Sequence, residues 1–278
     1  MRDQLSLRLE PEIATLPNLP DGLRPMLPRP AVEPFDSPAH LFEPWWGGLR
    51  AFAFVGPAET AGGGEVRIVD GAGRDVGAHL TELHGMAVRL DARSAVLDGE
   101  LVAVDDAGRA DSAELARRIA GSPGRAVAFL AFDLVHLDGR SLLTTPLHRR
   151  RELLRKVLHP GDEVVAVPAI AGEGRALHAA AAAQGIAGVL ARQRTSPYLA
   201  GVTSRLWRFV PAVAPKAGKG HAPRGAAQGD AATTGAASTA ASIDALPPGE
   251  PGEPGQPGAA SATPVIALIR RLPLLFDE

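Results

Sequence analysis

Lysine, the residue type whose amine could act as a nucleophile, is scarce in this chain. Of 29 basic residues three are Lys, namely Lys156, Lys216 and Lys219, and Cys is absent. Arginine stays protonated and cannot replace Lys in amine chemistry. A high-GC genome would explain the Arg excess most simply. The eight His residues are scattered, without the spacing of a metal site. Covalent chemistry through an amine would therefore depend on very few positions.

Two acidic residues lie inside the apolar run VLDGELVAV. Val96, Asp98 and Glu100 share one face of a strand because side chains alternate with period two, so the carboxylate of Glu100 can face a cleft. Asp98-Gly99 is alternatively a signal for a two-residue hairpin. The continuous apolar flanks favour the strand.

A third carboxylate, Asp133, lies in the apolar run FLAFDLVHL, directly after Phe132. This pair is either part of a ligand site or a core position with a hydrogen-bonded carboxylate. The run HRRREL (His148–Leu153) follows and resembles the basic start of a helix. A solvated helix face is the favoured interpretation, and contact with DNA phosphates is the alternative.

The elements that would position these side chains are predicted from periodicity and composition. Strands are expected at Arg50–Val55, Glu65–Val69, Ala95–Val104, Ala126–Leu137, Val164–Pro168, Ile186–Gln193 and Leu206–Val210. Helices are expected at Ala78–Leu90, Ser112–Ala120, His148–Leu158 and Gly174–Gln184. Strands outnumber helices and do not alternate with them, which predicts an α+β fold with largely antiparallel sheets.

The composition divides the chain into four parts. Residues 1–23 are rich in Pro and Leu and are expected to be flexible, and residues 24–211 have the composition of a globular domain. Residues 212–263 are mostly Ala, Gly, Pro, Ser and Thr, which predicts a disordered linker. Residues 264–278 are apolar again. This tail is expected either to fold back onto the domain or to bind a protein partner.

The bulk properties exclude several classes of protein. The net charge is −2 at pH 7, so no global basic field marks a nucleic-acid binder. The absence of Cys excludes disulfides and thiolate metal sites. No signal-peptide pattern and no apolar run of membrane-spanning length is found in this sequence. We therefore expect a cytoplasmic protein without a membrane partner.

Six segments in a particular order carry a resemblance to a known family. They are PMLPRP, FEPWWGGLR, VLDGELVAV, FLAFDLVHLDGRSLL, GIAGVLARQRTSPY and SRLWRFV, and they extend from Pro25 to Val210. Together they resemble the adenylation domain of bacterial ATP-dependent DNA ligases. The resemblance implies two antiparallel sheets flanked by helices, with ATP and Mg²⁺ bound in the groove between the sheets and with DNA as the partner. The OB-fold that follows in the family is not expected in this sequence.

The first motif of that family contains the nucleophilic Lys, followed two residues later by Asp. In FEPWWGGLR, Trp45 occupies the Lys position and Gly47 the Asp position. The indole nitrogen is a donor whose lone pair is delocalised, so Trp45 cannot attack a phosphate.

Other motifs depart from the family pattern as well. Ala187 replaces a metal-side Glu, and a methyl group offers no oxygen to a hard cation. Arg192 and Arg208 stand where the family has Lys, and Arg208 could point to the opposite face of its strand. Residues 70–73 align with a Ser-Arg-Asn-Gly stretch and lack its Arg.

Several positions keep the family residue, and the resemblance implies that they line the nucleotide groove. With Arg192 and Arg208 they form the set of nucleotide-binding candidates: Glu43, Arg50, Glu100, Phe132 and Asp133. Glu100 is also the candidate metal ligand.

Three functions follow from this pattern. The favoured hypothesis is a degenerate ligase that keeps the fold and acts by binding a nucleotide, DNA or a protein, because members of one catalytic constellation act as a unit. The first alternative is an active ligase with a relocated nucleophile, for which Lys156 is the candidate. The second is a protein-interaction module whose groove is occluded by Trp45 and Trp46.

Overall fold

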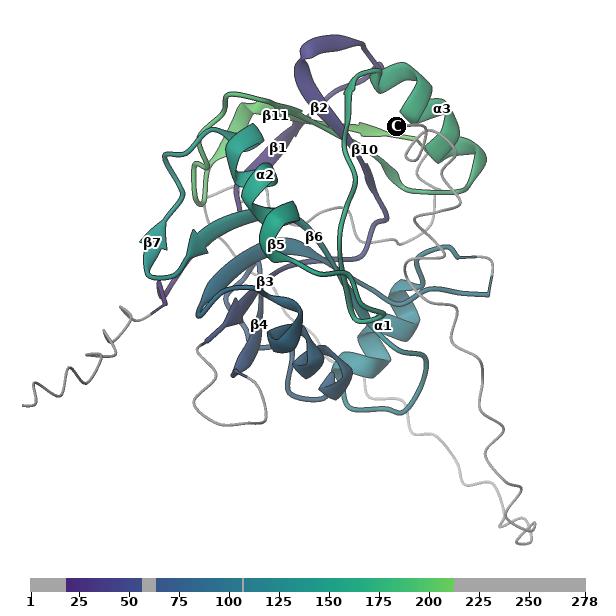
Figure 1. The fold of residues 1–278 in the computed structure, drawn as a ribbon. Helices are drawn as coiled ribbons and strands as arrows, with labels where there is room; N and C mark the ends of the chain where they lie inside the picture. The colour runs from purple at the N-terminus through teal and green to yellow at the C-terminus, as the bar shows by residue number, and fades with distance from the viewer. Residues whose placement is uncertain (1–18, 57–63, 107, 213–278) are drawn as a thin grey trace, which may run out of the picture.

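Two β-sheets face each other in the computed structural model, and helices cover their outer faces (Figure 1). The structure describes residues 19–56, 64–106 and 108–212. Residues 213–263 of the expected linker 212–263 lie outside the described residues, as do the expected tail 264–278 and residues 1–18 of the expected flexible segment 1–23. The predicted α+β fold with two sheets is confirmed.

The first sheet has five strands in the order β1-β11-β10-β2-β9. Their bounds are β1 Leu27–Pro30, β2 Ser37–Trp45, β9 Ile170–Gly172, β10 Gly188–Gln193 and β11 Thr203–Pro211. β1 pairs with β11 in parallel, and the other pairs are antiparallel. The helix α3 (Gly174–Ala183) packs on β10 and β2 through Leu177 and Ala181.

The second sheet has the order β4-β3-β5-β6-β7, and β8 pairs with β6 in parallel. The bounds are β3 Leu49–Val55, β4 Val66–Asp70, β5 Ala95–Val102, β6 Ala128–Leu137, β7 Arg140–Ser141 and β8 Val164–Ala166. Asp98 and Gly99 lie in the middle of β5, so the hairpin alternative was wrong. The glycine has a packing reason, because a Cβ there would lie 2.5 Å from the carbonyl oxygen of Leu130.

Two α-helices and one 3₁₀-helix belong to the second sheet. These elements are η1 Thr81–Arg89, α1 Ser112–Ile119 and α2 Leu147–Val157. The predicted helix 78–90 is therefore shorter than expected and of the 3₁₀ type. Leu80, Leu83 and Met86 are buried at a spacing of three residues, which is the period of a 3₁₀-helix rather than an α-helix.

Four strands were missed by the sequence analysis: β1, β2, β7 and β9. β2 contains Pro38 and Pro44, and proline within a run argues against a strand because it cannot donate to the ladder. The other three strands have at most four residues. Such short runs carry too few alternating positions to be recognised.

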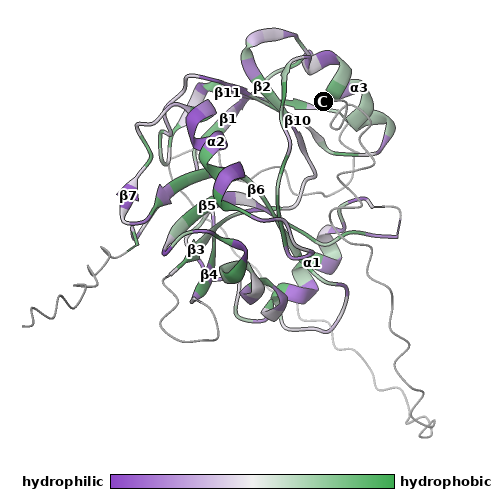
Figure 2. Ribbon diagram, in the orientation of Figure 1, coloured by the Kyte–Doolittle hydropathy of each residue, from purple (hydrophilic) through white to green (hydrophobic). Residues whose placement is uncertain are grey.

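Alternation along the strands separates an outer core from an inner one. In β3, Ala51 and Ala53 pack in the cluster under η1, α1 and α2, whereas Phe52 and Phe54 pack with Trp207 from the first sheet. Leu19 and Leu23 also pack against that inner cluster. Figure 2 shows the hydrophobic colouring along the central strands and hydrophilic stretches on α1 and α2. In the part of the chain that is described, no helix is long and apolar enough to cross a membrane.

Candidate functional site

Trp45 is the last residue of β2 and is half-buried, with its ring against residues of both sheets. Its ring lies 6.0 Å from that of Phe132 on β6 and 6.2 Å from that of Phe209 on β11, between centroids. The side chain at the expected nucleophile position is thus part of an aromatic contact that joins the two sheets.

Arg50 on β3 fills the adjacent space. Its guanidinium carbon lies 4.4 Å from the ring centroid of Phe132 and 5.7 Å from that of Trp45. Two nitrogens donate to Asp98 at 2.6 and 2.5 Å, and Tyr198 donates to the same carboxylate at 2.6 Å. Burial alone would lower the pKa of Arg50, but the Asp98 carboxylate raises it above its ordinary value. A permanent cation therefore covers one face of Phe132.

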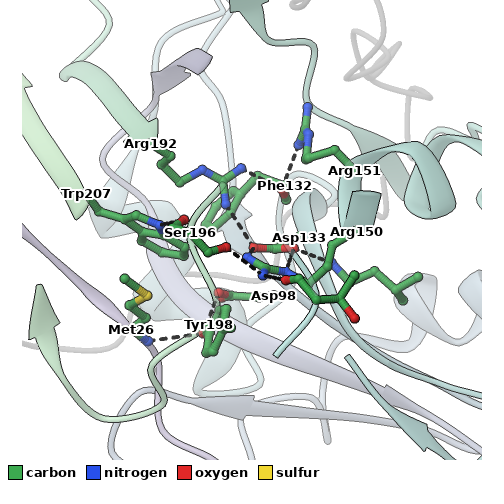
Figure 3. Close-up of polar contacts among 12 residues, drawn as sticks. Met26, Asp98, Phe132, Asp133, Arg150, Arg151, Arg192, Ser196, Tyr198 and Trp207 are labelled. Carbon is green, nitrogen blue, oxygen red and sulfur yellow. Dashed lines mark hydrogen bonds and ion pairs between the residues drawn. The ribbon is translucent and has the colours of Figure 1, made fainter. Parts of the chain in front are cut away.

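Deeper in the groove, a buried ionic network links the sheets and α2 (Figure 3). Asp133 accepts two hydrogen bonds from Arg150, both of 2.8 Å, and pairs with Arg192 at 3.2 Å. Arg192 also pairs with Glu43 at 2.5 Å, and Arg151 pairs with Glu43 at 3.1 Å. Burial would raise the pKa of Asp133, but these guanidiniums hold it below its ordinary value. The side chains of Arg192 and Asp133 thus tie β10 of one sheet to β6 of the other.

Arg150 and Arg151 were missed as site residues. Both interpretations of HRRREL, a solvated face and a DNA contact, were wrong for them, because their exposed fractions are 0% and 3%. Arg149 is exposed as expected and pairs with Glu152 at 2.8 Å. The signal was present in the spacing: Arg150 and Arg151 lie three and four residues after the buried Leu147, on the core face of α2.

The side chain of Glu100 contacts the loop that joins β2 to β3. Its carboxylate accepts hydrogen bonds from the backbone N–H of Trp46, at 3.2 Å, and of Gly48. The residue is 1% exposed. Burial raises the pKa of Glu100 to about 7, although the backbone N–H groups oppose this effect. The candidate metal ligand therefore acts as an anchor for the chain where it passes from one sheet to the other.

The raised pKa predicts how stability depends on pH. The folded protein holds the Glu100 proton up to about pH 7, whereas the unfolded chain releases it near pH 4.3. Between these values the folded state binds more protons, so this group lowers the free energy of unfolding as pH rises, by roughly 4 kcal/mol in all. The difference in unfolding free energy between wild type and Glu100→Gln should change across this window. A difference that is constant from pH 4.5 to 7.5 would contradict the prediction.

The remaining candidates lie away from this groove. Arg208 is exposed on β11, on the face opposite to the buried Trp207, where its charge contributes to lowering the pKa of His40 after the effect of burial. Lys156 is exposed on α2. Asp70, in the stretch aligned with Ser-Arg-Asn-Gly, closes a turn by accepting hydrogen bonds from the backbone of Ala72 and Arg74, both at 2.9 Å. The structure thus groups six of the seven nucleotide-binding candidates, all except Arg208, with Trp45, Arg150 and Arg151.

The charged side chains between the sheets are paired within the chain itself. Four guanidiniums pair with three carboxylates: Arg50 with Asp98, Arg150 with Asp133, Arg151 with Glu43, and Arg192 with Glu43 and Asp133. Glu100 accepts from backbone N–H groups instead, so all four carboxylates of the site already have donors. Ala187 touches the loop near Gly47 and offers only a methyl group. Within the described ranges no cluster of three His, Asp or Glu could hold a metal ion. These residues do not fit a magnesium–triphosphate complex.

The fold and this site define a member of a known family. Residues 28–208 match the family model described as ATP dependent DNA ligase domain, so the chain belongs to the ATP-dependent DNA ligase domain family. The expectation of an adenylation-domain fold is confirmed by this match and by the solved structures below.

Relatives and solved structures agree with this assignment. The multifunctional non-homologous end joining DNA repair protein LigD of Mycobacterium tuberculosis is 34% identical over 188 residues, which are 67% of this chain and 24% of that protein. A probable DNA ligase of Rhodococcus opacus is 36% identical over 152 residues, 53% of this chain and 30% of that protein. The chain thus spans about a quarter to a third of the length of these relatives.

Two of the similar structures are mycobacterial. One is described as mycobacterial DNA ligase D complexed with ATP and MES; it has a TM-score of 0.57 and 30% identity, and the match covers 68% of this chain and 60% of that one. The other is the ligase domain of M. tuberculosis LigD, also with a TM-score of 0.57 and 30% identity, over 67% and 58% of the two chains.

Proposed function

We propose that this protein is a catalytically inactive member of the DNA ligase family that acts in DNA repair by binding, not by sealing strands. Trp45 carries the proposal, because it stands where the family has its nucleophilic Lys. The relatives named for DNA repair and non-homologous end joining support the biological context.

The contents of the groove support binding without nucleotide chemistry. The guanidinium of Arg50 lies against Phe132, the ring that the resemblance puts near the adenine. Each of the four guanidiniums is already paired with a carboxylate of the same chain, so a triphosphate would have to displace these buried ion pairs. We therefore favour a degenerate ligase whose groove is occluded, which combines the favoured hypothesis of the sequence analysis with its second alternative. With the groove closed to nucleotides, this protein would bind DNA or another repair protein through its outer surface.

The decisive experiment tests for covalent adenylate. We expect no label on the denatured full-length chain after incubation with α-labelled ATP and Mg²⁺ or Mn²⁺, because a nucleophile is missing from the groove. The ligase domain of M. tuberculosis LigD is the positive control, and circular dichroism verifies that the sample is folded. A labelled chain would overturn the proposal. Loss of that label in Lys156→Arg would then support the active-ligase alternative, in which Lys156 is a relocated nucleophile.

Nucleotide binding without chemistry is tested separately. Trp45 contacts Phe132, so a base entering the groove would change its surroundings and its fluorescence. We expect no saturable change in intrinsic fluorescence when ATP is added to the full-length protein, after correction with free tryptophan for absorption. A saturable change that is lost in Trp45→Phe would show that the groove accepts a nucleotide.

A further inference from the structure

Arg208, the nucleotide-binding candidate that lies outside the groove, has a like-charged neighbour on the outer face of the first sheet. In the pairing of β1 with β11, Arg29 lies directly opposite Arg208. Both side chains are exposed, and neighbouring strands are about 4.8 Å apart, so two guanidiniums leave the sheet side by side. Like charges in directly opposite positions destabilise a sheet. An anion bound to both guanidiniums would remove this repulsion.

The two arginines have no partner within the described part of the chain. Neither Arg29 nor Arg208 makes a hydrogen bond or an ion pair there. Asp36, in the loop before β2, already pairs with Arg175 at the start of α3, at 3.9 Å. Glu33, which follows β1, is exposed and has no contact with either arginine in the described residues. The repulsion between the two guanidiniums is therefore not relieved by a carboxylate of the described chain.

Neutral polar groups of β2 and β10 lie next to these cations. The charge of Arg208 lowers the pKa of His40, after the larger effect of burial, and no carboxylate contributes to this shift. Nδ1 of His40 lies 2.9 Å from the hydroxyl of Ser37, and Gln193 lies opposite His40 in the pairing of β10 with β2. Cations beside hydroxyl and amide groups are the usual contacts to phosphate oxygens. The outer polar site is defined as Arg29, Arg208, His40, Ser37 and Gln193.

The outer polar site lies beside the part of the face that α3 covers. α3 packs over β10 and β2, and Figure 1 shows it at the end of this sheet away from β1. A protein interface usually needs an aromatic or apolar anchor at its centre. The large hydrophobic residues that are exposed in the described ranges include no aromatic and come from three different segments: Val32, Val88, Leu199 and Val202. The site therefore suits a phosphate backbone better than an apolar protein surface.

We propose that the outer polar site binds the phosphate backbone of double-stranded DNA. This inference rests on the proposed function, which leaves DNA and a repair protein as partners, and it selects DNA. The two guanidiniums pair with phosphates, and the neutral groups of β2 and β10 donate to phosphate oxygens. The net charge of −2 does not oppose such binding, because exposed charges act over only about 8 Å at physiological salt.

The salt dependence of DNA affinity tests this proposal. In fluorescence anisotropy without ATP, we expect the full-length protein to bind a labelled duplex with a dissociation constant that rises with NaCl concentration. Arg29→Gln/Arg208→Gln should weaken binding at low salt by about tenfold or more. It should also reduce the slope of the logarithm of the dissociation constant against the logarithm of the NaCl concentration by about 2, one for each lost phosphate contact. Arg208→Lys should keep the slope, because Lys also binds phosphate as a point charge.

Arg93→Gln/Arg140→Gln is the matched control, because both double variants have the same net charge. Both control arginines are exposed on the second sheet: Arg140 lies on β7, and the backbone N–H of Arg93 donates to Asp138 beside it. We expect the control to bind as the wild type does. Equal losses in the two double variants would overturn the proposal, as would a wild type that does not bind the duplex. Either result leaves the proposed function with a protein partner, whereas a covalent adenylate would overturn the proposed function itself.

The repulsion between the two arginines gives a second measurement. Arg29→Gln or Arg208→Gln removes a like-charge pair, so the midpoint of thermal unfolding should stay the same or rise. A lower midpoint in both variants would show that the arginines are kept because they stabilise the sheet, and it would contradict a role in binding an external anion.

Discussion

Replacing Asp133 by Asn should lower the free energy of unfolding by roughly 3–5 kcal/mol, the usual effect of removing one partner of a buried ion pair. Asp133 is 0% exposed and accepts from Arg150 and from the backbone N–H of Leu134. Asn keeps the shape but loses the charge, which leaves Arg150 with only the carbonyls of Thr145 and Ser196 and weakens the contact with Arg192. Chemical denaturation of the full chain measures the change.

Glu152→Gln is the matched control, because it removes a carboxylate from a pair on the surface of the same helix. Its side chain is 48% exposed and pairs with Arg149 at 2.8 Å. Exposed pairs contribute at most about 1 kcal/mol. If both variants lose the same small amount, the buried network does not hold the sheets together.

The second large effect is expected for Gly48→Ala in the loop between the sheets. A Cβ at this position would lie 2.1 Å from the carbonyl oxygen of Leu101 and 2.9 Å from Cγ1 of Val102. Backbone atoms cannot retreat as a flexible side chain can, so β3 would separate from β5 and the bond to Glu100 would be lost. We expect a loss of roughly 3 kcal/mol or more, seen as a lower denaturation midpoint or as insoluble expression.

Gly56→Ala is the control for this substitution. Gly56 lies at the other end of β3, and the nearest atom to its Cβ is the carbonyl oxygen of Glu65 at 3.7 Å, an ordinary contact. The control should change stability by less than about 1 kcal/mol. A Gly48→Ala protein as stable as the control would show that the loop adapts.

The fold could be predicted from the sequence because most strands coincide with apolar runs and because six motifs occur in the order found in the family. The type of helix at 78–90 could not be predicted. Leu80 and Leu83 fit the period of both a 3₁₀-helix and an α-helix, and only the burial of Met86, three residues further on, indicates a 3₁₀-helix. β2 was hidden by Pro38 and Pro44, although it carries both Glu43 and Trp45.

The sequence predicted which residues form the site better than it predicted the contacts between them. Trp45, Arg50 and Phe132 were found through the motifs, but the stacking of Arg50 on Phe132 depends on how β3 and β6 are placed through β5. Arg150 and Arg151 were misjudged because charge was taken as a sign of exposure. Their carboxylate partners lie 17 residues and more than 100 residues away along the chain, and local sequence carries no information about such distant pairs.

The buried ion pairs between the sheets also change how this domain depends on its surroundings. A protein that closes around a nucleotide gains stability in proportion to the logarithm of ligand concentration. Here Arg192 bridges Glu43 and Asp133. Because all three residues belong to one polypeptide, the contact between the sheets does not depend on the concentration of any ligand. Under the proposed function, in which no nucleotide enters the groove, the folded domain needs no ligand to join its sheets, and its stability is expected not to change with the ATP concentration of the cell.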